Sequence, residues 1–139
     1  MTVRNLEFAV RPRSVTVIGA SIRDGSVGKV VLDNIVDGGF EGDIWPVNPK
    51  YDTIGGLRCY PDAAALPGVP DLAVIVTPPE SVPGIITALG KRGTRAAVVI
   101  TAGLTVRNGL RQKMLDAAKP YLFRIIGPNT LGLMIPPVK

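Results

Sequence analysis

Small residues follow a run of β-forming residues near the N-terminus, and their spacing could bind a phosphate group. The run Ser14-Val15-Thr16-Val17-Ile18 continues into Gly19-Ala20-Ser21. Soon afterwards Gly25-Ser26-Val27-Gly28 opens a segment with helical spacing. In α/β folds, a glycine-containing loop of this kind brings backbone N–H groups and a helix N-terminus close to a phosphate. The segment therefore predicts an anion-binding loop.

The sequence excludes several kinds of catalytic and metal site. It contains no histidine and a single cysteine, Cys59. Without histidine, these residues can form neither a Ser-His-Asp nor a Cys-His catalytic centre, and a lone cysteine can form no disulfide within the chain. No CxxC pair or other zinc-ligand spacing occurs. We therefore expect no catalytic residue and no metal site, and we expect Cys59 to be an unreactive thiol.

The same loop lacks the fingerprint of dinucleotide-binding proteins. That fingerprint is G-x-G-x-x-G after the first strand, with an acidic residue at the end of the second strand that holds the ribose hydroxyls. Here the glycines are more widely spaced, and the second expected strand ends in Asn48-Pro49-Lys50. A lysine at this position favours a phosphorylated ribose, as in NADP or coenzyme A, over the ribose of NAD. No Walker A motif occurs, which argues against nucleotide hydrolysis at a P-loop.

Alternating apolar segments predict the elements that position these loops. Apolar β-rich runs indicate strands near residues 14–18, 43–47, 71–76, 96–100 and 122–126. Helical spacing predicts helices near residues 27–37, 61–66, 82–89 and 110–118. Residues 6–13 are expected to lead into the first strand, with Leu6 and Phe8 packed on the sheet edge. Residues 131–139 are expected to add a final strand before a domain boundary.

These units predict an α/β fold: a Rossmann-like, doubly wound parallel sheet of five or six strands with helices on both faces. The length of 139 residues fits a single domain. Counting strands from the N-terminus, we expect the order 3-2-1-4-5. Ligands bind where such an order reverses. The crevice is therefore expected between the first and fourth strands, with walls at residues 20–28 and at Thr101-Ala102-Gly103.

Composition narrows the classes of partner. The 16 basic and 11 acidic side chains give a net charge of +5 that is spread along the chain, which favours an anionic ligand. Aromatic residues make up only 5%, too few for a base-stacking surface, so no nucleic-acid partner is expected. No apolar run approaches the ~20 residues of a membrane-spanning helix, and the N-terminus lacks a signal-peptide core. We therefore expect a cytoplasmic protein with no membrane partner.

Five motifs, taken in order, resemble one family. They are RPRSVTVIGAS at residues 11–21, PVNPK at 46–50, DLAVIVTP at 71–78, TAG at 101–103 and GPNTLG at 127–132. Together they resemble the CoA-binding domain of nucleoside-diphosphate-forming acyl-CoA synthetases, such as ADP-forming acetyl-CoA synthetase and the α subunit of succinyl-CoA synthetase. The resemblance implies that residues 1–139 form a CoA-binding domain, N-terminal in a longer synthetase.

The resemblance also implies a ligand, CoA or acyl-CoA, and a part for each motif. The loop 21–28 would hold the pyrophosphate and the adenosine end, and Lys50 would contact the phosphorylated ribose. Residues 76–78 would line the adenine and pantetheine path, 101–103 would lie along pantetheine, and Asn129 would lie near the thiol. The implied binding residues are Gly19, Ala20, Ser21, Arg23, Ser26, Val27, Gly28, Asn48, Pro49, Lys50, Val76, Thr77, Pro78, Thr101, Ala102, Gly103 and Asn129.

The reaction of that family converts acyl-CoA, ADP and phosphate into a carboxylic acid, CoA and ATP through a phosphohistidine. Since this sequence has no histidine, the resemblance implies further domains or a second subunit that supply the histidine and an ATP-grasp module, and it allows an oligomer. Two alternatives remain open at this point. The same kind of region occurs fused to an N-acetyltransferase, where it would be a regulatory sensor of CoA or acyl-CoA. The chain could also be a fragment of an NADP-binding oxidoreductase.

Overall fold

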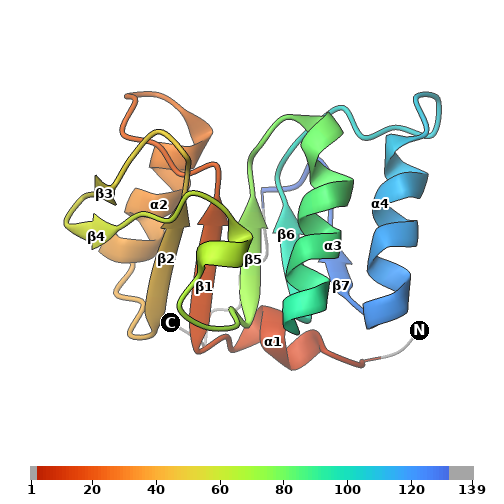
Figure 1. Cartoon of the computed structure of the whole chain (residues 1–139), viewed down its shortest axis with the longest axis horizontal. Helices are drawn as coiled ribbons and strands as arrows, with labels where there is room; N and C mark the ends of the chain where they lie inside the picture. The colour runs from red at the N-terminus through yellow and green to blue at the C-terminus, as the bar shows by residue number, and fades with distance from the viewer. Residues whose placement is uncertain (1–2, 132–139) are drawn as a thin grey trace.

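The main sheet is parallel and has five strands in the described part of the chain. The computed structural model describes residues 3–131 (Figure 1). The strands are β1 (Ser14–Ile18), β2 (Asp43–Val47), β5 (Leu72–Ile75), β6 (Ala96–Val99) and β7 (Arg124–Ile126), and they pair in the order β2-β1-β5-β6-β7. The predicted α/β, Rossmann-like class is confirmed. Residues 132–139, where most of a sixth strand was expected, lie outside the described residues.

Helices lie on both faces of this sheet, as expected (Figure 1). They are α1 (Leu6–Val10), α2 (Val27–Asp37), α3 (Val82–Arg92) and α4 (Leu110–Ala118). Successive residues of β5 pack on opposite faces: Ala73 and Ile75 pack with α3 and α4, whereas Leu72 and Val74 pack with side chains of α1 and α2. This burial on both faces explains why the strands appear as continuous apolar runs in the sequence.

The expected strand order is wrong. Counted from the N-terminus, the observed order of the five strands is 2-1-3-4-5, because β5 pairs with β1 on the side opposite β2. Apolar runs do not tell which strands are neighbours, but Pro46 within β2 carried a signal. A central strand pairs with a neighbour on each side and so uses all of its N–H groups. Proline has no N–H group, and it therefore favours an edge strand. The order therefore reverses between β1 and β5, and the crevice between the first and fourth strands does not exist.

The outer side of β2 is partly covered by residues 51–60. Their centre is a two-stranded hairpin of β3 (Thr53–Ile54) and β4 (Leu57–Arg58), which turns at Gly55 and Gly56. Beyond it, the N–H of Tyr60 donates to the Pro46 carbonyl at 2.9 Å, and the N–H of Asn48 donates to the Tyr60 carbonyl at 2.9 Å. These bonds fix the loop that leaves β2.

Two local predictions also need correction. Residues 6–10 of the expected lead-in form the helix α1, which is too short for helical periodicity to be visible in the sequence. Its Phe8 packs on the sheet, but Leu6 is 36% exposed. The expected helix at 61–66 is a single 3₁₀ turn, Ala63–Ala65. Among residues 3–131, no helix has the length and apolar character to cross a membrane.

Candidate functional site

A cavity of about 510 Å³ opens where β1, β2 and β5 end. It is lined by Ile18, Gly19, Val47, Asn48, Pro49, Pro61, Asp62, Ala63, Ala64, Thr77, Ser81, Gly84, Ile85 and Ala88. The lining is mostly apolar, and Asp62 is its one charged residue. Burying an unpaired charge is costly. The cavity therefore suits an uncharged, largely apolar part of a ligand, and phosphate groups would lie outside it.

Two glycines, Gly19 and Gly28, are required at the end of β1, because a side chain at either position would collide with neighbouring atoms. Gly19 has φ of +98°, and a Cβ atom on it would lie 2.9 Å from Val76 Cγ2. Gly28 lies in the first turn of α2, and a Cβ atom there would lie 2.0 Å from the Gly19 carbonyl oxygen. The helix thus packs directly on the strand end, which is the role that one glycine has in dinucleotide-binding loops.

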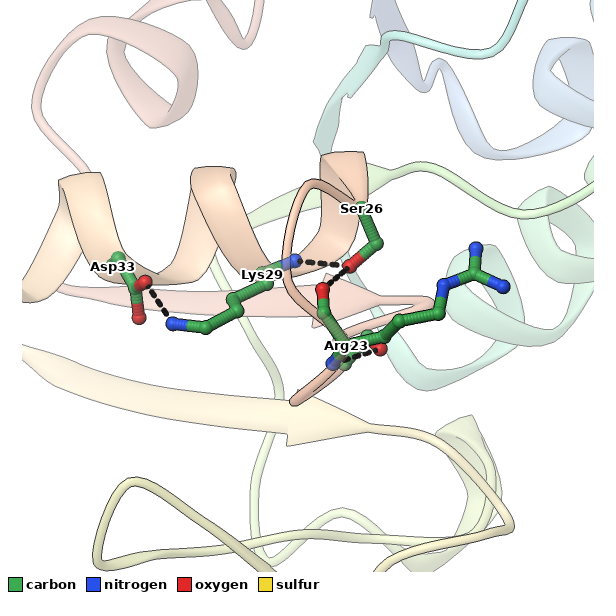
Figure 2. Close-up of polar contacts among 5 residues, drawn as sticks. Arg23, Ser26, Lys29 and Asp33 are labelled. Atoms are coloured by element: carbon green, nitrogen blue, oxygen red, sulfur yellow. Dashed lines mark hydrogen bonds and ion pairs between the residues drawn. The ribbon is translucent and has the colours of Figure 1, made fainter.

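The loop between β1 and α2 is held by its own serines (Figure 2). Ser26 caps α2: its Oγ accepts a hydrogen bond from the Lys29 amide at 3.3 Å and donates to the Arg23 carbonyl at 2.7 Å. The Ser21 Oγ accepts from the Arg23 amide at 3.0 Å. The amides of Val27 and Gly28 have no intrahelical acceptor, because they open the helix. An anion at this loop would therefore meet backbone amides rather than serine hydroxyls.

The two cations of this loop differ in their surroundings. Lys29 pairs with Asp33 one turn along α2, and this hydrogen bond and the Asp33 charge raise the pKa of Lys29. Figure 2 shows the Arg23 guanidinium pointing away from that pair. Arg23 is exposed. Its charge is thus more available to a ligand than that of Lys29.

Asn48 joins the end of β2 to the end of β1. Its Nδ2 donates to the Ala20 carbonyl at 2.8 Å, and its Oδ1 accepts from the Lys50 amide at 2.9 Å. Asn48 and Pro49 line the cavity, and Lys50 follows them as an exposed residue. The long cationic side chain of Lys50 therefore lies one residue beyond the cavity wall.

The turns after β5 and β6 are linked by threonines. Thr101 Oγ1 donates to the Thr77 carbonyl at 2.7 Å, and Ser81 Oγ lies 2.8 Å from Thr77 Oγ1. The N–H of Asn129 donates to the Thr101 carbonyl at 3.0 Å. Residues 76–78, 101–103 and 129 thus follow one another along the carboxyl edge of the sheet. Of these residues, Thr77 alone lines the cavity.

The structure brings only part of the expected site together around the cavity. Four of the expected residues line it: Gly19, Asn48, Pro49 and Thr77. Ser21 instead faces a smaller cavity of about 180 Å³ between α2 and the hairpin. Ala20 is fully buried, Val27 and Gly28 begin α2, and the other expected residues lie in the loops that follow the strands. Among residues 3–131, no three potential acidic or cysteine ligands gather as a metal site would require.

Sequence reasoning missed two walls of the cavity. One wall is residues 61–64, and the other is the face of α3 that carries Ser81, Gly84, Ile85 and Ala88. These four residues follow the spacing i, i+3, i+4, i+7, and three of them are small. A helical face with small residues leaves room beside it, so this spacing was a usable signal. The wall at 61–64 had no comparable signal, because its place depends on contacts distant in sequence.

Comparison with known proteins agrees with this architecture. A family model described as a CoA binding domain matches residues 13–136. The ADP-forming acetate–CoA ligase of Methanocaldococcus jannaschii is 44% identical over 131 residues, and the 4-hydroxybutyrate–CoA ligase of Nitrosopumilus maritimus is 37% identical over 127 residues. The alignments cover 93% and 88% of this chain.

Solved structures agree as well. The dinucleotide-forming acetyl-coenzyme A synthetase 1 of Ca. Korarchaeum cryptofilum, in complex with phosphate and ADP, superimposes with a TM-score of 0.88 and 37% identity over 95% of this chain. The chain covers 29% of that structure and 18% of each of the two ligases. It thus corresponds to one part of much longer proteins. The chain belongs to the CoA-binding domain family found in ADP-forming acyl-CoA synthetases.

Proposed function

We propose that this chain binds CoA with the adenine ring in the cavity at the ends of β1, β2 and β5. The observation that carries the proposal is an apolar cavity whose wall, Asn48 and Pro49, runs directly into the exposed cation Lys50. Adenine is flat and uncharged, and its ribose carries the 3′-phosphate of CoA. An adenine in the cavity would therefore present that phosphate at the mouth, within the reach of Lys50.

The pyrophosphate would lie at the start of α2. There the amides of Val27 and Gly28 and the positive end of the helix favour an anion. The exposed Arg23 adds a full charge to this end of the loop. Lys29 contributes less in this proposal, because Asp33 already neutralises it.

Pantetheine would extend away from the cavity along the turns that follow β5 and β6. There the Thr101 hydroxyl donates to the Thr77 carbonyl, and the Asn129 N–H donates to the Thr101 carbonyl. Pantetheine carries two amide groups, and such a row of polar backbone and hydroxyl groups suits them. This path would bring the thiol toward Asn129, which is exposed.

The parent protein is proposed to be an ADP-forming acid–CoA ligase that converts acyl-CoA, ADP and phosphate into acid, CoA and ATP. Its histidine and nucleotide-binding module would come from other domains or a second subunit, because this sequence has no histidine. The two ligase relatives are named for different acids, acetate and 4-hydroxybutyrate. We therefore place the choice of acid outside this domain. CoA in this reaction is a substrate rather than a bound cofactor.

Isothermal titration of CoA into the purified chain, with thermal unfolding in parallel, tests the proposal. A free ligand concentration of one hundred times Kd should stabilise the fold by about 2.7 kcal/mol. The variant Gly84→Leu would fill the cavity, because Gly84 lines it and its Cβ position has open space for a side chain. It should fold normally and lose CoA binding. Binding of NADPH in preference to CoA, or no binding of CoA by the folded wild type, would contradict the proposal.

A further inference from the structure

The guanidinium of Arg92 spans from the last turn of α3 to the segment 64–68. Its Nη1 donates to the Ala64 carbonyl at 3.0 Å, and its Nη2 donates to the carbonyls of Leu66 at 2.8 Å and Gly68 at 3.1 Å. Its Nε is buried and has no hydrogen-bond partner among the described residues. The hydrogen bonds of the guanidinium in the described residues thus all go to these three carbonyls.

The place of Arg92 connects this contact to the cavity. Arg92 lies four residues after Ala88, on the helical face whose earlier residues line the cavity. Residues 61–64 form the facing wall, and the Ala64 carbonyl that Arg92 binds belongs to that wall. The guanidinium thus fastens the two walls to each other at one end.

Apart from Arg92, the segment is held by local hydrogen bonds and by two side chains in the core, Ala63 and Leu66. The Asp62 side chain accepts from the Ala65 amide at 3.0 Å, but the backbone bonds of the turn are long, at 3.3 Å for Ala65 to Asp62 and 3.4 Å for Leu66 to Ala63. Most side chains of residues 61–67 are exposed; Ala63 and Leu66 are the buried ones. A fork that binds three carbonyls at once is specific to arginine, since lysine offers a single point charge.

We propose that Arg92 is a positioning residue that holds the wall at residues 61–64 against the adenine ring. This inference rests on the proposed function, because it assumes that adenine occupies the cavity. Without the guanidinium, the wall would fluctuate and the ring would lose contacts on one side. The loss would fall on the adenosine part of the ligand, and the pantetheine path on the turns after β5 and β6 would be unaffected.

The test compares Arg92→Ala and Arg92→Lys with Arg95→Ala. Arg95 is the control because Arg95→Ala also removes one positive charge and a guanidinium-to-carbonyl hydrogen bond, at 3.1 Å, but its acceptor, Tyr121, is not part of the cavity wall. Calorimetry measures the affinity of each variant for CoA and for adenosine 3′,5′-bisphosphate, which lacks pantetheine. Amide hydrogen exchange of residues 62–68, measured without ligand, reports the wall itself.

We expect Arg92→Ala to lower the affinity for CoA and for the bisphosphate by the same factor, about tenfold, and to speed amide hydrogen exchange at residues 62–68. Arg92→Lys should show an intermediate loss of affinity, and it replaces Arg92→Ala in the comparison if the alanine variant does not fold. Arg95→Ala should stay within about twofold of the wild type. Unchanged exchange, or a loss seen with CoA but not with the bisphosphate, would overturn the role of Arg92. Failure of the wild type to bind either ligand would instead overturn the proposed function, and the exchange data, which need no ligand, would separate the two results.

Discussion

The first turn of α2 packs closely on the end of β1: a Cβ atom on Gly28 would lie 2.0 Å from the carbonyl oxygen of Gly19. The obstacle is backbone, which cannot rotate away as a side chain could. This close approach places the amides of Val27 and Gly28 beside the strand end. The geometry of the proposed pyrophosphate site therefore depends on the absence of a side chain at residue 28.

Gly28→Ala should consequently destabilise the fold. The added methyl group would have to displace either the helix or the strand, and overpacking of this kind costs about 3 kcal/mol or more when backbone must shift. Urea unfolding measures the effect. Gly84→Ala is the control: it also lies in a helix, but nothing lies within 4 Å of its Cβ position, so it should gain up to about 1 kcal/mol from helix propensity. Equal unfolding midpoints for the two variants would contradict the described packing.

Asn48→Ala should affect both stability and binding. The substitution removes the bond from Asn48 Nδ2 to the Ala20 carbonyl and the bond from the Lys50 amide to Asn48 Oδ1. We expect a loss of about 1–2 kcal/mol in the free energy of unfolding, with weaker CoA binding because the ends of β1 and β2 are no longer joined. Asn34→Ala, an exposed position in α2, is the control. A variant as stable as the control and with wild-type affinity would show that the link has no such role.

Lys50→Ala should discriminate between CoA and dephospho-CoA. Only CoA carries the 3′-phosphate, so its affinity should fall roughly tenfold while that of dephospho-CoA changes little. Titration calorimetry at two salt concentrations measures both affinities, and the salt dependence of CoA binding should also decrease. Lys113→Ala, an exposed lysine of α4, controls for net charge. Equal losses for the two ligands would mean that Lys50 contacts another part of CoA, or none.

Cys59 should make stability fall at alkaline pH. Burial raises the pKa of the Cys59 thiol above its ordinary value of 9.0, and backbone contacts with Asn48 and Tyr60 offset this only in part. The unfolded chain loses the thiol proton at a lower pH than the folded chain. The contribution of Cys59 to the free energy of unfolding is therefore fully present below about pH 9 and is lost as the pH rises through the folded pKa. Urea unfolding between pH 7 and pH 10 should show a steeper decline for the wild type than for Cys59→Ala. Parallel curves would contradict the shifted pKa.

The sequence allowed prediction of the fold class and of most strands and helices, because these depend on local signals. Of the expected binding residues, Gly19, Asn48, Pro49 and Thr77 line the cavity. Apolar runs, helical spacing and small residues after each strand are visible without knowing which strands pair. The glycines at 19 and 28 belong to these signals, and their packing shows why they are needed.

The strand order and the cavity wall at residues 61–64 escaped prediction for a physical reason. They depend on contacts between residues that are far apart in the chain, such as the bonds from Arg92 to carbonyls 24 to 28 residues earlier. Pro46 was the local signal for an edge strand. With β2 at the edge, the expected crevice would have lain between β1 and β5 instead of between β1 and β6. That single change brings Thr77 to the cavity in place of the turn at Thr101-Ala102-Gly103.

Intermolecular nuclear Overhauser effects measure the position of the adenine ring directly. In isotope-labelled protein with saturating CoA, the adenine H2 and H8 protons should show effects to the methyl groups of Ile85 and Ala88, which line the cavity. Ile22 and Val27, which are 54% and 52% exposed outside that cavity, provide the comparison. Effects from adenine to these two residues, with none to Ile85 and Ala88, would place the ring outside the cavity and contradict the proposed binding mode.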